Sequence, residues 1–137
     1  QKLGVTLAEV GSYIYNEKST SVTAGTGGVS GLVNIYDNLG VITARQASAD
    51  SAKKYPANGF VPEVIAEGNP ATVLLFGKLE GDFSSVTDGN GKVLYLSETD
   101  GLFTETPPAT EGALRQKVGF AITDLLVVLD IEEPIEL

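Results

Sequence analysis

The sequence predicts an all-β fold: a small β-barrel or sandwich of about eight short strands with an N-terminal arm. Turn residues such as Asp-Asn-Leu-Gly, Asp-Gly and Pro-Pro recur at short intervals, a spacing typical of β-hairpins. The 16 glycines and 6 prolines punctuate the whole chain, and no window keeps an apolar face at the helical period for long. A length of 137 residues with 42% hydrophobic residues is enough for one domain with a packed core.

The N-terminal part differs in composition from the rest of the chain. Residues 16–31 are mostly Ser, Thr and Gly, which predicts a flexible linker or long loop. We therefore expect residues 1–31 to form an arm that ends in this linker, and residues 32–137 to form the barrel. Short helices are expected only locally, at residues 6–15 and 48–54.

The predicted strands are short segments rich in Val, Ile, Leu, Tyr, Phe and Thr that lie between turn signals. They span residues 32–36, 41–45, 59–65, 72–79, 93–97, 102–106, 114–122 and 126–131.

Two of these strands carry apolar residues on both faces. Tyr95 alternates with Leu94 and Leu96, and the segment LLVVLDI near the C-terminus has the same character. Such a strand is buried on both sides, either by a loop of its own chain or by a neighbouring subunit. The second alternative predicts an oligomer interface that contains Tyr95, Leu126 and Val128.

Composition argues against most catalytic and nucleic-acid functions. Cys, His, Trp and Met are all absent, so disulfides, thiolate and imidazole chemistry and the usual transition-metal ligands are missing. The net charge is −9 and no cluster of Lys and Arg occurs, which disfavours nucleic acid and anionic membranes as partners. The longest apolar run is interrupted by Asp124 and Asp130, so no membrane span is expected. We predict a soluble protein that is not an enzyme and has no cofactor.

A few short motifs resemble chemical sites but have simpler explanations. DGNGK at residues 88–92 resembles the start of a calcium loop, yet the further acidic ligands are missing and an Asn-Gly turn explains it. The pairs Glu98 with Asp100 and Glu132 with Glu133 lie in a turn and a tail, where charge serves solvation. GTGG at residues 25–28 lacks the Lys-Ser/Thr of a phosphate loop. We therefore predict no metal site and no catalytic residue.

Several blocks occur in an order that resembles a known family. They are GLVNIYD, ANGFVPEVIAEGNPATVLLFG, GKVLYLSETDGLFTETPPATEGALRQKVGFAIT and LLVVLDIEEPI. This succession resembles a domain of tailed-bacteriophage virion proteins described as head decoration, head fibre or capsid-stabilising proteins. In that domain the block Tyr-Leu-Ser matches residues 95–97, and the block Gln-x-Val-Gly-x-Ala matches residues 116–121.

The matched residues also have structural explanations. Gly101 after Asp100 fits a tight hairpin that needs positive φ. Pro107 and Pro108 are expected to end strand pairing, and Gly119 is expected where a larger side chain would clash with a crossing strand.

The resemblance implies a virion structural protein on the capsid exterior. Its partners would be the major capsid protein and two further copies of itself in a homotrimer. The alternative is a tail or fibre adhesin that recognises a host surface glycan, which the absence of Trp argues against.

The N-terminal segment is a candidate for attachment. It alternates apolar and polar residues but has too little apolar surface to fold alone. One hypothesis is that it contacts the capsid protein or an adjacent subunit, and the other is that it packs as the first strand or helix of its own barrel. The apolar residues concerned are Leu3, Val5, Leu7, Val10, Ile14 and Tyr15.

Overall fold

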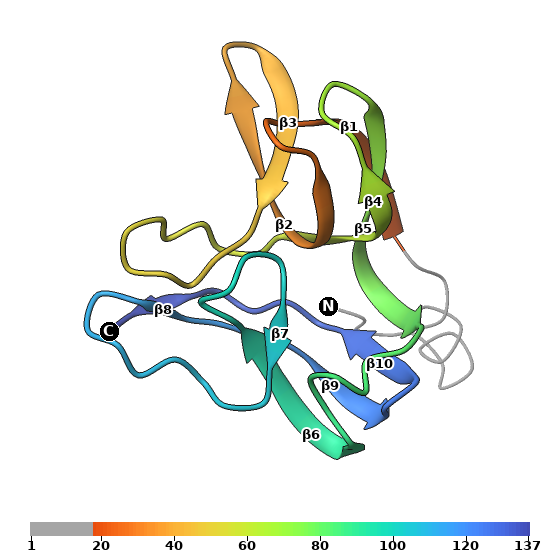
Figure 1. Cartoon of the computed structure of the whole chain (residues 1–137), viewed down its shortest axis with the longest axis vertical. Coiled ribbons are helices and arrows are strands. Elements are labelled where there is room, and N and C mark those ends of the chain that lie inside the picture. The colour runs from red at the N-terminus through yellow and green to blue at the C-terminus, as the bar shows by residue number, and fades with distance from the viewer. Residues whose placement is uncertain (1–17) are drawn as a thin grey trace, which may run out of the picture.

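The computed structural model describes residues 18–137, whose arrangement is shown in Figure 1. This part of the chain is built from β-strands and turns, so the all-β prediction is confirmed. Among the described residues there is no helix long and apolar enough to cross a membrane. The strands are β1 (Lys18–Ala24), β2 (Val29–Asn38), β3 (Val41–Gln46), β4 (Gly59–Ile65), β5 (Pro70–Glu80), β6 (Gly89–Leu96), β7 (Phe103–Thr104), β8 (Leu114–Arg115), β9 (Lys117–Thr123), β10 (Leu126–Leu129) and β11 (Ile135–Glu136).

The first five strands close into a barrel. They follow the order β1-β3-β2-β4-β5, and β1 also pairs with β5, which completes the ring. β1 runs parallel to β3, whereas the other neighbouring strands are antiparallel. Closure of this kind removes the free edges through which open sheets tend to aggregate.

The long strand β5 joins the barrel to a second sheet. Residues Pro70 to Phe76 of β5 pair with β1, and residues Gly77 to Glu80 pair with β10. Beyond β10 the order continues β9-β6-β7, and we call β10, β9, β6 and β7 the C-terminal sheet. Figure 1 shows the barrel, coloured red to green, above this teal and blue sheet. β8 and β11 form a separate pair.

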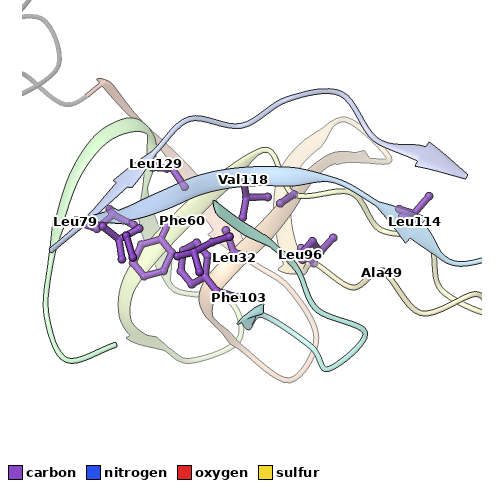
Figure 2. Packing of buried hydrophobic residues seen from close by; sticks show 14 residues of the cluster. Leu32, Ala49, Phe60, Leu79, Leu96, Phe103, Leu114, Val118 and Leu129 are labelled. Carbon is purple, nitrogen blue, oxygen red and sulfur yellow. The ribbon is translucent and has the colours of Figure 1, made fainter. Parts of the chain in front are cut away.

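Neighbouring residues on the barrel strands face two different cores. Val33 and Val61 lie in the barrel interior, whereas the preceding residues Leu32 and Phe60 point out of the barrel. This outward side is covered by the C-terminal sheet, which contributes Leu94, Leu96, Val118, Val127 and Leu129 to the larger core seen in Figure 2. The two cores explain why apolar residues occur consecutively in β2 and β4.

The prediction of a flexible linker at residues 16–31 is wrong for residues 18–31, which the structure describes. Residues 18–24 form β1, and β2 begins at Val29, so the barrel already includes residues that precede residue 32. Ser and Thr supply the outer positions of β1, while Val22 and Ala24 are buried in the barrel. Two buried side chains are enough to hold β1 in the barrel, because its backbone also pairs with β5 and β3 on its two sides. The first part of the arm lies outside the described residues.

The short helix expected at residues 48–54 is also wrong. Ser48 and Tyr55 form a β-bridge, and the chain between them makes a turn. The carbonyl of Asp50 accepts from the amides of Lys53 and Lys54, and its carboxylate accepts from the amide of Ala52 at 2.7 Å. The Asp side chain thus stabilises a single turn that ends at the bridge. The helix expected at residues 6–15 lies outside the described residues.

Candidate interaction surface on the C-terminal sheet

The three residues of the predicted oligomer interface share one face of the C-terminal sheet. Tyr95 lies on β6, whereas Leu126 and Val128 lie on β10, and all three are half-buried. The residues that alternate with them on these strands face the core and are fully buried. The alternation inferred from the sequence therefore places the three side chains on the side of the sheet that faces away from the barrel.

The strand register joins this face into a continuous surface. Phe120 on β9 is opposite Val93 on β6 and opposite Val128 on β10. Side chains directly opposite each other in antiparallel strands are about 5 Å apart at Cβ, so these three form an apolar row across the sheet. We call the whole set the outer face. It consists of Val93, Tyr95, Phe120, Ile122, Leu126 and Val128.

Phe120 was missed in the sequence analysis, although a signal for it exists. On β9 the small residues Gly119 and Ala121 are buried, and the large Phe120 lies between them. A strand that alternates small inward residues with large outward ones carries its side-chain volume on the outer side. This pattern marks the outer face before any pairing is known.

Charged residues surround the apolar row. Lys78 is opposite Val128 and makes an ion pair with Glu80 at 3.2 Å. Lys117 is opposite Tyr95 and makes an ion pair with Glu132 at 3.5 Å. An apolar centre with a polar rim is the usual anatomy of a protein–protein interface.

The beginning of β1 lies beside the outer face. Lys18, the first residue of β1, is opposite Phe76 on β5. The next residue, Gly77, begins the part of β5 that pairs with β10. The N-terminal candidates Leu3, Val5, Leu7, Val10, Ile14 and Tyr15 lie outside the described residues, but they precede this point of entry.

Three of the carboxylates considered as chemical sites, Asp88, Asp100 and Glu98, each have a different partner. Asp88 accepts from the ammonium of Lys92 at 2.8 Å, and this bond lowers the pKa of Asp88 and raises that of Lys92. Asp100 is bound by Lys53 at 2.7 Å, and Glu98 accepts from the hydroxyl of Thr110. Within residues 18–137 no three acidic side chains are grouped so that they could hold a metal ion.

Comparison with protein-family models, with characterised proteins and with solved structures finds no match to this chain.

Proposed function

We propose that this chain is a non-enzymatic structural protein of a tailed-phage virion, bound to the outer surface of the capsid as a decoration or stabilising protein or as the base of a head fibre. The proposal is supported by the order of the sequence blocks and by the apolar outer face with its charged rim. The outer face is the observation that carries it, because a surface of this kind serves association with proteins and not turnover of a substrate.

A decoration protein stabilises a shell by binding only its assembled form. Many copies on a symmetric lattice convert a modest affinity at one site into strong attachment overall. The net charge of −9 fits an exterior position, because an acidic protein does not compete for the packaged genome.

We assign the outer face to contact between subunits, in a homotrimer, and residues 1–17 to contact with the capsid protein or an adjacent subunit. The segment enters at Lys18, next to the outer face. An extended chain of this length reaches roughly 55 Å, whereas four paired strands are roughly 15 Å wide. The segment is therefore long enough to pass beyond the sheet to a neighbour.

In this proposal the trimer depends on the outer face. A charge at the centre of the outer face should therefore dissociate the trimer. At micromolar concentration we expect the intact chain to show about three times its monomer mass of 14.3 kDa in light scattering, and Phe120→Glu to show the monomer mass at the same concentration. Phe120 is half-buried and points away from the core. The melting temperature of the Phe120→Glu variant in dilute solution should therefore differ little from that of the intact chain. The matched control is Val64→Glu, at an apolar residue of the barrel that is 83% exposed. An intact chain that is monomeric at micromolar concentration contradicts the trimer.

Deletion of residues 1–17 tests attachment. The cut ends before β1, so the truncated chain should keep the circular dichroism and the cooperative unfolding of the intact protein. We expect it to stop sedimenting with capsids of the parent virus. Undiminished sedimentation, or loss of the fold, refutes the assignment of this segment. Binding of the intact chain to a glycan array but not to capsids would favour an adhesin instead.

A further inference from the structure

The described part of the chain contains the dipeptide Asn-Gly in two different settings. Asn58-Gly59 lies at the beginning of β4, and Asn90-Gly91 lies at the beginning of β6. In such a dipeptide the backbone nitrogen of the glycine can attack the side-chain amide carbon of the asparagine, because glycine has no Cβ to hinder the approach. The folded chain determines whether these two atoms can meet.

The side chain of Asn58 is held at both ends of its amide. Its Oδ1 accepts from the backbone amide of Ile35 at 2.7 Å, and its Nδ2 donates to the carbonyl of the same residue at 3.3 Å. The backbone amide of Asn58 donates to the carbonyl of Val33 at 2.9 Å, and the buried Gly59 is opposite Val33 in the sheet. Attack at Asn58 would break these contacts, so the folded state protects this site.

Asn90 and Gly91 have no such contacts. The register between β6 and β9 passes directly from Gly89 to Lys92, so the two residues between them form a bulge. On the other side of β6, β7 pairs only with the end of the strand. Asn90 and Gly91 are both exposed, and no hydrogen bond joins the Asn90 side chain to another residue between 18 and 137.

The backbone explains why an asparagine occupies this position. Gly89, Asn90 and Gly91 have φ values of +90°, +60° and +70°, so three consecutive residues are left-handed. Asparagine accepts this conformation better than most residues with side chains. The glycines on both sides have the widest range of φ and ψ, so the backbone can rotate until the nitrogen of Gly91 faces Cγ of Asn90. The residue that suits the turn is therefore also a reactive one.

We propose that Asn90 is a site of spontaneous deamidation in the folded protein, whereas Asn58 is protected. The nitrogen of Gly91 forms a bond to Cγ of Asn90, and the bond from Cγ to Nδ2 breaks. The proton of the Gly91 amide passes through solvent to the departing nitrogen, which leaves as ammonia. Water then opens the cyclic imide at one of its two carbonyl carbons and gives aspartate or isoaspartate. Water is the only further reactant.

The remaining described asparagines lack one of these conditions. Asn69 is followed by Pro70, whose nitrogen carries no proton and cannot form the imide. Asn34 and Asn38 are each followed by a large aliphatic residue, which hinders the approach of the backbone nitrogen. Within residues 18–137, Asn90 is thus the asparagine that combines a following glycine with an unbound side chain.

The reaction changes the charge at one end of the C-terminal sheet. Figure 1 shows β6 beginning at the lower end of the molecule. The new carboxylate adds one negative charge to the net charge of −9, next to the ion pair of Asp88 and Lys92. Thr123 is opposite both Gly89 and Leu126, so the charge develops at the edge of the outer face. The inference goes beyond the proposed function, because the reaction takes place in the isolated chain.

Mass spectrometry after trypsin digestion tests the proposal on the intact chain. Cleavage after lysine places Asn90 in a peptide of residues 79–92 and Asn58 in a peptide of residues 55–78. During incubation of the folded protein near neutral pH, we expect Asn90 to change from amide to acid at least about tenfold faster than Asn58. Fragmentation of the peptides assigns each change to its residue. The rate at Asn90 should rise with pH, because the Gly91 amide attacks after losing its proton.

Incubation in urea above the unfolding transition is the matched control. Unfolding removes the hydrogen bonds of Asn58 and the bulge at Asn90, so the two identical dipeptides should then react at similar rates. The variant Asn90→Asp supplies the aspartate product directly. The incubated intact chain should acquire a form that elutes with this variant in anion exchange.

Two results overturn the inference. The first is an Asn90 that reacts in urea but stays intact in the folded chain, which would show that the left-handed backbone protects it. The second is equal rates at Asn58 and Asn90 in the folded chain, which would show that the hydrogen bonds of Asn58 give no protection. Neither measurement uses capsids or depends on association of subunits, so failure here is distinct from failure of the proposed function.

Discussion

Replacing Gly119 by alanine should lower the free energy of unfolding by about 3 kcal/mol. Gly119 lies on β9 in the middle of the C-terminal sheet, opposite Leu94 on one side and Leu129 on the other. A Cβ atom there would overlap the backbone oxygen of Val128 and lie 3.2 Å from its carbonyl carbon. Backbone atoms cannot rotate away, so β10 would have to move. The clash expected from the sequence at this glycine is thus confirmed.

Gly81→Ala is the matched control for this prediction. The atoms nearest to a Cβ at Gly81 belong to the ring of Phe83, at 3.6 and 3.8 Å, which is ordinary van der Waals contact. We expect a change within about 0.5 kcal/mol in urea denaturation. Equal losses for the two variants would show that the close approach of β9 and β10 at Gly119 is not the cause.

Strands with strong local signals could be predicted from the sequence. The segment expected at residues 59–65 coincides with β4, and that expected at residues 41–45 lies within β3. Gly101 has the expected positive φ, +75°. These features depend on nearby residues, because alternation and turn chemistry are local properties.

Elements that depend on distant partners could not be predicted. β1 has few apolar residues, and it is a strand because it pairs with β5, about fifty residues further on. The single strand expected at residues 114–122 is divided into β8 and β9 at Gln116. Gln116 looks like an ordinary strand residue, and only its partners in the folded chain reveal its role.

The outer face was likewise predictable only in part, because one part of it depends on local sequence and the other on distant strands. The sequence indicated apolar residues on both faces of the strands that carry Tyr95, Leu126 and Val128, and in the folded chain these three side chains are half-buried on the side away from the core. Their joining through Phe120 requires the order β10-β9-β6, which no local pattern contains. Whether the face binds another subunit stays a prediction.

Gln116 should be the most sensitive polar residue of the described chain. Its side chain is 2% exposed, and its Oε1 accepts from the amide of Ala57 at 2.8 Å. Its Nε2 donates to the carbonyls of Ala57 and Glu132, both at 2.8 Å. The amide thus connects the loop before β4 and the C-terminal segment to the junction between β8 and β9. Gln116→Leu leaves three backbone groups without these partners and should cost about 3–5 kcal/mol in urea denaturation.

Gln46→Leu is the comparison for that loss. The Gln46 side chain is half-buried and accepts from the amide of Ser30 at 3.0 Å, so removing it should cost about 1 kcal/mol. Similar losses at the two positions would show that the buried network around Gln116 has no special weight.

The variant Gln116→Glu should lose stability by an amount that depends on pH. The geometry around the side chain determines whether this loss grows or shrinks as the pH rises. An ionised carboxylate would face the carbonyl oxygens of Ala57 and Glu132 in a buried site, so the folded state should raise the pKa of the introduced carboxyl above its ordinary value. Below about pH 4 the group is protonated in both the folded and unfolded chains, and one carboxyl proton can still be donated. As the pH rises, the unfolded chain loses the proton first, so stability falls progressively towards pH 7. We therefore expect the deficit relative to the unsubstituted chain, measured in urea at each pH, to grow by at least about 2 kcal/mol between pH 4 and pH 7. A deficit that is the same at both pH values contradicts the hydrogen bonds assigned to Gln116.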